Sequence, residues 1–461
     1  MRPPPTRLLH LLALTGLAGA QLLLAYATPR PAFGQLLALW GLSFGLYAYL
    51  LRTRLPLRAG LVAALVLRLL WLPALPALSD DYHRFRWDGL LLASGVNPYQ
   101  FRPDEFGAGS AWFAARPDRA ASRVPPKLTT NNEQQKTKNE LAALYPKLNS
   151  PHYYSVYPPV CQAAFGLAAV LAPASERGAV LVLRLVLVLA EAGTAALLLA
   201  LLRAWGQDLR RALWYLLNPL VLVELTGNLH FEALVVCLLL LTLWLLRRGR
   251  AGAAGAALGL AVGTKLLPLL VLPLLVRRLG WRQTLWCAAG TSVVLVVVLA
   301  PFASPELAAN VGRSLGLYFR TFEFNASLYY LLRAAGTGLV GYNPIAWVGP
   351  ALALTTAAGI LLLAARERRP TLASLPHTLL LTLAFYYALA TTVHPWYLAP
   401  LVALSVFSRW RFALVWSGVA VLSYAAYQTA AYSENLWLVG LEYAVVVAAV
   451  LGESRRVPAP V

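Results

Sequence analysis

Apolar runs long enough to cross a lipid bilayer recur along this chain from residue 7 to residue 451. Hydrophobic residues make up 59% of the 461 positions and charged residues only 13%. A soluble protein of this length does not need so many continuous apolar segments of about 18 residues or more. The segments are also solidly apolar instead of alternating with a period of two, which excludes an outer-membrane β-barrel. The chain is therefore predicted to be an all-α polytopic membrane protein.

We expect a bundle of about 12 transmembrane helices plus short re-entrant helices, with one large external loop at residues 79–157. The expected spans lie at about residues 8–27, 33–51, 59–78, 179–202, 212–227, 231–247, 282–302, 345–365, 371–392, 396–407, 411–431 and 435–451. The run 158–171 is too short to span comfortably, so it is predicted to be a short interfacial or re-entrant helix. The run 251–276 lies between two arginine clusters, so it is predicted to enter the membrane and return, with Gly263, Thr264 and Lys265 at the turn.

The distribution of basic residues predicts the orientation of the chain. The net charge of +20 comes from 34 Arg and 5 Lys against 19 acidic residues. Because basic residues concentrate in cytoplasmic loops, the arginine clusters between the spans place the N-terminus inside and residue 79 outside. The stretch from Pro125 to Lys147 is predicted to be a flexible, solvated segment. The lipid bilayer is the expected partner of the basic charge, and no nucleic acid is expected because no basic, aromatic-interleaved soluble domain is present.

The stretch from Ser79 to Tyr99 carries three of the 19 acidic residues, Asp80, Asp81 and Asp88, directly after an apolar run. Read as a helix, it places Asp81, Arg84 and Asp88 on one face. The predicted topology brings further ionisable residues to the outer ends of other spans, namely Glu224, His230, Glu232, Glu323 and His394. An ionisable group at bilayer depth costs about 2.5 to 3.5 kcal/mol, so such a cluster indicates a site. The alternative is that some of these residues snorkel to the membrane surface or cap helices.

Lys265 is the only lysine outside the external loop. It is interpreted either as a phosphate contact or as an interfacial lysine that faces lipid headgroups. Arg184 and Glu191, seven residues apart in one span, are expected to form a structural ion pair. The chain has no P-loop, HExxH or DxD motif, and no cytoplasmic segment is large enough for a nucleotide-binding domain. A group-transfer donor would therefore have to be presented by the membrane, most simply as a lipid phosphate.

Several stretches occur in a characteristic order along the chain. They are Ser79-Asp80-Asp81 with Arg84, Trp87-Asp88-Gly89, Gly95 to Tyr99, Tyr157-Pro158-Pro159-Val160, Asn218-Pro219 with Gly227 to His230, Thr264-Lys265 with Pro268, Glu323-Phe324-Asn325, and His394-Pro395-Trp396-Tyr397. In these residues the chain resembles the integral-membrane glycosyltransferases of the GT-C architecture that use polyprenyl-phosphate sugars, and most closely their bacterial mannosyltransferase-like members.

The resemblance implies a GT-C-like transmembrane domain at residues 56–460, including the external loop 79–157, with a transmembrane hairpin at residues 1–55 added before it. It also implies that Asp81 or Asp80 is the general base; Asp81 is preferred, but the choice stays open. The residues expected to bind the substrate or its lipid phosphate are Arg84, Lys265, His394, Trp396, Tyr397, Glu323, Asn325, His230, Trp87 and Asp88. The family does not specify the sugar, and mannose is preferred.

The sequence thus predicts a multi-pass glycosyltransferase of the cytoplasmic (inner) membrane with its active site facing outside. It would transfer a sugar, with inversion, from a polyprenyl-phosphate carrier to an envelope glycan or lipid acceptor. Lys265, Arg84 or His394 would stabilise the phosphate charge. The scheme requires no metal or other cofactor, although it does not exclude a divalent metal. Alternatives are a flippase or transporter of lipid-linked sugars, which would favour an inverted repeat that is not found in the sequence, and a non-catalytic component of polysaccharide assembly.

Overall fold

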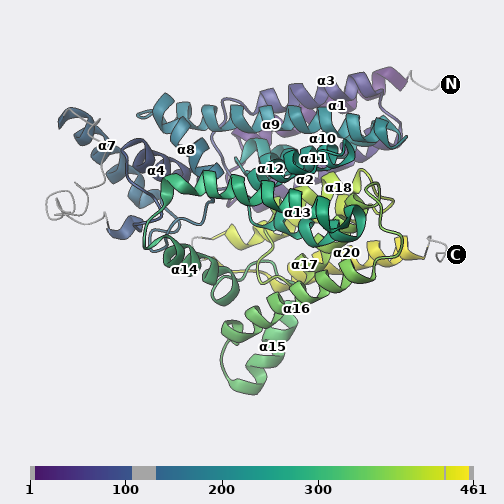
Figure 1. The fold of residues 1–461 in the computed structure, drawn as a ribbon. Helices are drawn as coiled ribbons and strands as arrows, with labels where there is room; N and C mark the ends of the chain where they lie inside the picture. The colour runs from purple at the N-terminus through teal and green to yellow at the C-terminus, as the bar shows by residue number, and fades with distance from the viewer. Residues whose placement is uncertain (1–5, 106–130, 430–431, 456–461) are drawn as a thin grey trace.

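A computed structural model describes residues 6–105, 131–429 and 432–455 of the chain, and residues 106–130 of the predicted external loop lie outside the described residues. Most of the described residues are helical (Figure 1). Within the described part, β-structure is limited to an isolated bridge between Phe324 and Thr392. The prediction of an all-α polytopic membrane protein is therefore confirmed.

Six helical segments among the described residues are long and apolar enough to cross a membrane. They are built on α1 (Thr6–Tyr26), α2 (Phe33–Arg52), α9 (Glu176–Ala204), α13 (Val271–Leu299) with its flanking turns η5 (Leu267–Leu270) and η6 (Ala300–Phe302), α16 (Ile345–Arg366) and α20 (Leu436–Ser454). A seventh span is formed if η4 (Val221–Gly227) and α11 (Glu232–Arg247), which are bent by 107°, cross together. This number is below the roughly 12 spans expected from the apolar runs.

Shorter helices account for the difference, because several apolar runs are divided. Four apolar segments are too short to meet the same length criterion: α8 (Pro159–Leu171), α12 (Ala251–Val262), α17 (Leu375–Leu389), and α19 (Phe412–Val419) joined to η8 (Ala420–Tyr427). The expected span at 59–78 is represented by α3 (Leu57–Leu70), which ends where Pro73 and Pro76 prevent the helix from continuing.

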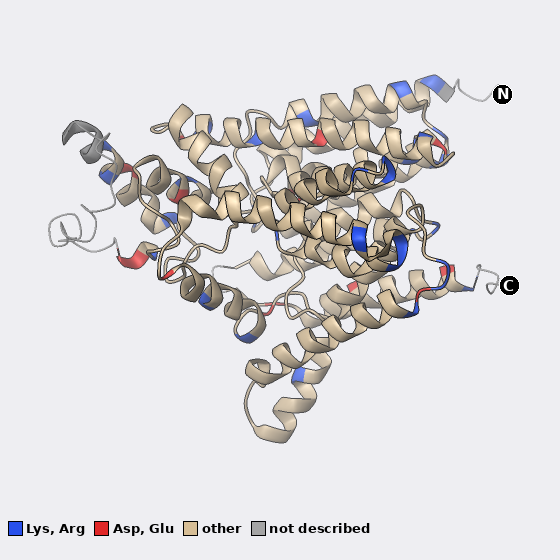
Figure 2. Ribbon diagram, viewed as in Figure 1, with Lys and Arg blue, Asp and Glu red and all other residues tan. Residues whose placement is uncertain are grey.

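The remaining elements form the ends and connections of the bundle. They are α4 (Asp81–Ala93), η1 (Pro103–Glu105), α7 (Asn131–Leu144), η2 (Tyr145–Lys147), η3 (Leu209–Ala212), α10 (Leu213–Leu216), α14 (Leu307–Arg320), α15 (Leu328–Val340), η7 (Pro395–Leu398) and α18 (Ala399–Ser405). Both chain termini lie at one end of the molecule, whereas α4 and α7 lie at the other end (Figure 1). Many lysine and arginine segments gather at the end that holds the termini (Figure 2).

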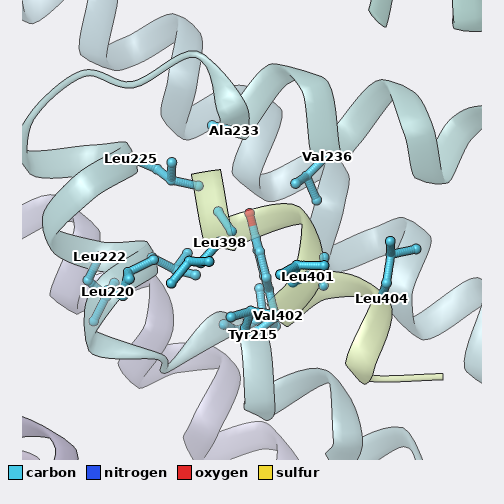
Figure 3. Close-up of a cluster of buried hydrophobic side chains, with 14 of the residues drawn as sticks. Tyr215, Leu220, Leu222, Leu225, Ala233, Val236, Leu398, Leu401, Val402 and Leu404 are labelled. Atoms are coloured by element: carbon cyan, nitrogen blue, oxygen red, sulfur yellow. The ribbon is translucent and has the colours of Figure 1, made fainter. Parts of the chain in front are cut away.

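The centre of the bundle joins two segments that are distant in the sequence. Buried side chains from the region of Leu220 to Val236 pack against the segment from Leu398 to Leu404, and both are essentially inaccessible to solvent (Figure 3). The chain breaks at Asn218-Pro219, where the Asn218 side chain accepts a hydrogen bond from the backbone N–H of Leu220 at 3.0 Å. Because of this break, the chain does not continue as one straight span, and the irregular segment that follows enters the core.

The N-terminal hairpin of α1 and α2 packs into the bundle. Trp40 donates a hydrogen bond to the carbonyl of Gly418 at 3.0 Å, and Tyr47 donates one to the carbonyl of Trp214 at 2.6 Å. Gln21 of α1 accepts a hydrogen bond from the indole of Trp71 at 3.1 Å. The hairpin therefore contacts segments from the first, middle and last thirds of the chain.

Part of the predicted external loop is more ordered than the sequence predicts. Within the stretch expected to be flexible up to Lys147, residues 131–144 form α7. Leu141 and Leu144 are buried against Trp87 of α4. Leucines spaced three residues apart share one helix face, so this polar segment has an apolar side that packs on α4. The prediction of a flexible segment is wrong for this part of the loop.

The expected ion pair between Arg184 and Glu191 is also wrong. Arg184 is fully buried and donates hydrogen bonds to the carbonyls of Leu72, Ala74, Thr226 and Gly227 at 2.5 to 2.9 Å. Glu191 accepts hydrogen bonds instead from Arg68, at 2.5 Å, and from Tyr215, at 2.6 Å. The irregular chain around residues 72–74 and 226–227 leaves carbonyls without helical partners, and Arg184 satisfies them.

Candidate functional site

Asp80 and Asp81 lie at the N-terminal end of α4 but have different partners. Asp80 forms an ion pair with Arg30, which lies in the turn between α1 and α2. Asp81 accepts one hydrogen bond, from the side-chain amide of Asn149, at 2.9 Å. Both aspartates are partly exposed to solvent. Asp80 is therefore neutralised by a cation, whereas the Asp81 carboxylate is bound by a neutral donor.

Three other predicted residues on α4 point into the protein. Arg84 binds the Asp88 carboxylate at 2.8 Å and the carbonyls of Ser150 and Tyr153 at 3.2 and 3.1 Å. Asp88 is fully buried and also accepts hydrogen bonds from the side chains of Ser155 and Gln162, at 2.5 and 2.9 Å. Trp87 packs in the apolar contact with α7. The structure thus places these three predicted binding residues where they hold α4 against its neighbours.

A stack of four rings forms a second part of the site. The ring centroids of Phe324 and His394 lie 4.6 Å apart, those of His394 and Trp396 4.3 Å apart, and those of Trp396 and His230 3.7 Å apart. The backbone of Phe324 is bound to the 391–393 segment, since its N–H donates to the Thr391 carbonyl at 3.0 Å and its carbonyl accepts from Val393 at 2.8 Å. Two loops that are 70 residues apart in the sequence are thereby joined into one surface.

His230 is oriented by Glu224. Its Nδ1 lies 3.0 Å from the backbone carbonyl oxygen and 3.2 Å from the side-chain Oε2 of Glu224, so Nδ1 carries the proton and donates. Glu224 is itself bound by the hydroxyl of Tyr424 at 2.6 Å. His230 Nε2 is buried and has no hydrogen-bond partner in the described part of the chain. This nitrogen is left as an acceptor at the edge of the ring stack.

His394 contributes a neutral ring. Burial lowers the pKa of His394 to about 3, with a smaller contribution from the charge of Lys265. The imidazole is therefore uncharged at physiological pH. The expectation that His394 could supply positive charge to a phosphate is not supported, and stacking is its main contact.

Lys265 forms an ion pair with Glu232 at the start of α11. The Lys265 ammonium also lies 3.5 Å from the ring centroid of Tyr397. Burial lowers the pKa of Lys265, and the Glu232 carboxylate opposes this effect. The pair lines one part of a small apolar cavity of about 20 Å³, whose other walls are mostly apolar side chains of α11, η5, α13, α17 and α18. A cation therefore stands beside a small apolar cavity.

Tyr318 of α14 lies near enough to the carboxylates of Asp81 and Glu232 for both to affect its pKa. Burial raises the pKa of Tyr318, and the carboxylates of Asp81 and Glu232 raise it further. On the Asp80 side, the Arg30 guanidinium lies 4.5 Å from the ring centroid of Tyr427, and that ring lies 6.0 Å from Phe324. A series of ring contacts therefore connects the end of α4, through Tyr427 and Phe324, with the ring stack and the Lys265–Glu232 pair. The predicted residues at the two ends of this series and along it are Asp80, Asp81, His230, Lys265, His394, Trp396 and Tyr397.

Glu323 and Asn325 flank Phe324 but have other partners. Glu323 binds Arg333 of α15 at 2.6 Å. The backbone N–H of Asn325 donates to Glu434 at 2.6 Å, and its side-chain amide donates to Glu442 at 3.1 Å. Asn325 has a φ of 46°, a conformation that asparagine tolerates better than most residues. Both residues, predicted to bind substrate, instead hold the loop that presents Phe324.

Arg30 and Tyr318 are site residues that the sequence reasoning missed. A signal for Arg30 existed, because the predicted topology places the short turn between the first two spans outside, where an arginine is unfavourable for orientation. An outer arginine on the same side as Asp80 could have been paired with it. Tyr318 carried no such signal, since α14 lies in a stretch without an assigned span. Among the described residues, no group of three or more His, Cys, Asp or Glu side chains is arranged to hold a metal ion.

Comparison with known protein families gives a match for residues 151–280, to the family model described as alpha-(1->6)-mannopyranosyltransferase, N-terminal domain. No curated protein matches the chain. The matched segment contains Glu224, His230, Glu232 and Lys265, which lie on one side of the site. With its apolar helices, the chain is a multi-pass membrane protein, and this match confirms that it is similar to membrane mannosyltransferases of the GT-C type.

Proposed function

We propose that the protein is an inverting glycosyltransferase that moves a mannosyl group from a polyprenyl-phosphate carrier to a hydroxyl group of an envelope glycan or lipid. The observation that carries this proposal is the position of Lys265. It stands beside a small apolar cavity on one side and packs on the Tyr397 ring on the other. Ring contacts continue from Tyr397 through His394 and Phe324 to Tyr427, over which lies Arg30, the partner of Asp80 next to Asp81. An amphiphilic donor with one anionic group between a lipid chain and a sugar fits this order of contacts.

The donor phosphate would bind at Lys265, and the polyprenyl chain would extend along the apolar side chains of α11, η5 and α17 that line the small cavity beside it. A lysine is suited to a phosphate because its ammonium is a compact point charge with three donors. Glu232 would then be the counter-ion that Lys265 exchanges for the phosphate. The sugar would lie at the edge of the ring stack, because His394 and His230 stack on Trp396. Tyr397 lies below the ammonium, and His230 Nε2 is free to accept a hydrogen bond from a sugar hydroxyl.

Asp81 is the proposed general base. The Arg30 cation occupies Asp80, whereas Asp81 keeps most of its carboxylate lone pairs available beside its bond from Asn149. In the proposed step, Asp81 takes the proton of the acceptor hydroxyl while the hydroxyl oxygen forms a bond to the anomeric carbon. The bond from that carbon to the phosphate oxygen breaks, and its electrons leave with polyprenyl phosphate, whose charge Lys265 stabilises. The scheme uses no metal.

The proposed active site faces the outside of the cytoplasmic membrane. The arginine clusters gather at the end of the bundle that holds both termini, and α4 lies at the other end (Figures 1 and 2). Basic ends of membrane bundles are predominantly cytoplasmic. Site residues near α4 would therefore meet donor and acceptor at the outer surface.

The test is transfer by the purified protein in lipid nanodiscs, with labelled polyprenyl-phosphate mannose and a glycan acceptor. We expect Asp81→Asn to lower kcat by about 10²- to 10⁴-fold, because this is the range of general-base assistance. Asp80→Asn should cause a smaller loss. Wild-type rates in the Asp81→Asn variant would refute the base assignment. Movement of the lipid-linked sugar across the bilayer without transfer would instead support a flippase.

A further inference from the structure

The turn between α1 and α2 places Arg30 beside the active-site end of α4. Thr28 donates a hydrogen bond to the carbonyl of Leu23 at 2.8 Å, and Gln35 donates one to the carbonyl of Ala27 at 3.0 Å. These bonds fix the short connection on both sides of Arg30. From there its guanidinium reaches Asp80 and lies over the ring of Tyr427.

The ion pair with Arg30 takes the place of the helix-capping hydrogen bond that an aspartate at position 80 would usually make. Asp80 is the N-cap residue of α4, where an aspartate side chain usually accepts a hydrogen bond from one of the first free N–H groups of the helix. The Asp80 side chain makes no such bond. Its carboxylate is instead turned to Arg30. The contact therefore replaces a favourable local interaction with one that reaches across 50 residues.

The neighbouring carboxylates create a need for this contact. Two adjacent carboxylates repel each other when both are ionised. A cation that pairs with Asp80 alone offsets the Asp80 charge and leaves the Asp81 oxygens free to accept a proton.

We infer that Arg30 is a positioning residue, supplied by the N-terminal hairpin, that binds and neutralises Asp80 so that Asp81 alone acts as the free carboxylate. The inference rests on the proposed function. It also gives the hairpin a part in the reaction. Since the side chains of the pair are 26% and 44% exposed, the pair contributes little to stability, and its loss should appear in activity before it appears in folding.

The experiment compares Arg30→Gln, Arg30→Lys and the double variant Arg30→Gln/Asp80→Asn in the same nanodisc assay. Arg30→Gln should lower kcat on the order of tenfold and leave the donor KM within about twofold, because the catalytic base is affected and donor binding is not. Arg30→Lys should retain most of the activity. The double variant should recover to the rate of Asp80→Asn, because no unpaired neighbouring charge remains. Arg210→Gln, which breaks an exposed ion pair with Asp208, is the matched control.

Three results would overturn the inference while the proposed function stands. One is an Arg30→Gln variant with the wild-type kcat. Another is a double variant as impaired as Arg30→Gln. The third is a raised donor KM in Arg30→Gln, because Arg30 would then contact the substrate directly. A wild-type protein that transfers no sugar would refute the proposed function and this inference with it.

Discussion

Single side chains in this site are defined by their partners more than by their positions in the sequence. Asp80 and Asp81 are adjacent, yet one is paired with a cation and the other with an amide. The sequence placed both on the outer side but could not distinguish them, because the cation comes from a turn 50 residues away. The charges of the residues and the side of the membrane predicted for them therefore indicate where a site lies. The role of each carboxylate depends on its tertiary contacts.

The Lys265–Glu232 pair allows phosphate binding to be separated from stability. Replacing Lys265 with Met leaves the buried Glu232 carboxylate without its partner. We expect Lys265→Met to lower the free energy of unfolding by about 2 kcal/mol, below the range for fully buried pairs because the lysine is 30% exposed. The double variant Lys265→Met/Glu232→Gln should recover the thermal midpoint in detergent but still show a raised donor KM. A double variant with the wild-type KM would contradict the phosphate role of Lys265.

The sequence predicted which helix ends carry site residues more accurately than it predicted the side-chain partners of those residues. Span counting places His230, His394, Trp396 and Tyr397 on the outer side, and the family resemblance adds Lys265; these five residues meet in the structure. Span counting also places Glu323 and Asn325 on that side, and the resemblance adds Arg84 and Asp88, but these four residues bind other parts of the protein. A topology count assigns a residue to one side of the membrane, and it cannot tell whether the side chain faces the site or a neighbouring loop.

At the scale of elements, the helix boundaries depend on single residues, such as prolines. The average hydropathy of an apolar run does not reveal them. The sequence predicted α1, α2, α9, α16 and α20 closely, because each is a long run without interior breaks. It overextended the run that ends at Leu70, where two prolines follow, and the run that is interrupted at Asn218-Pro219. The turn at residues 263–265 was expected, and the structure has α12 ending directly before it.

Close packing of α12 against α13 depends on particular glycines. A Cβ atom on Gly255 would lie 2.0 Å from the Cys287 carbonyl oxygen, and Thr291 donates a hydrogen bond to the Gly255 carbonyl at 3.0 Å. Small residues allow membrane helices to approach in this way. We expect Gly255→Ala to lower the free energy of unfolding by about 1 to 3 kcal/mol, because the helices must separate.

The matched control for this change is Gly252→Ala on the same helix. A Cβ atom on Gly252 would meet no atom within 4 Å. This variant should therefore unfold at the wild-type temperature or slightly above it, since alanine favours the helix. Thermal unfolding in one detergent measures both proteins. Equal midpoints for the two variants would show that the contact between α12 and α13 tolerates an added methyl group.

At the scale of the whole molecule, the proposed reaction depends on which end of the bundle faces outward. We expect the end with the termini to be cytoplasmic because the basic segments gather there, and α7 lies at the opposite end (Figures 1 and 2). Ala142 is an exposed residue of α7, and Ala373 is an exposed residue in the connection that follows the cluster from Arg366 to Arg369. These two alanines allow the same substitution to be compared at both ends.

We expect Ala142→Cys to react with a membrane-impermeant maleimide in sealed right-side-out vesicles, whereas Ala373→Cys should react only after the vesicles are permeabilised. The wild-type protein supplies the background, which should be low because Cys161 and Cys287 are buried and Cys237 is only partly accessible. The reverse labelling pattern would place the Asp81 site in the cytoplasm. A polyprenyl-linked donor on the outer leaflet could then not reach it, so the result tests the orientation on which the proposed reaction depends.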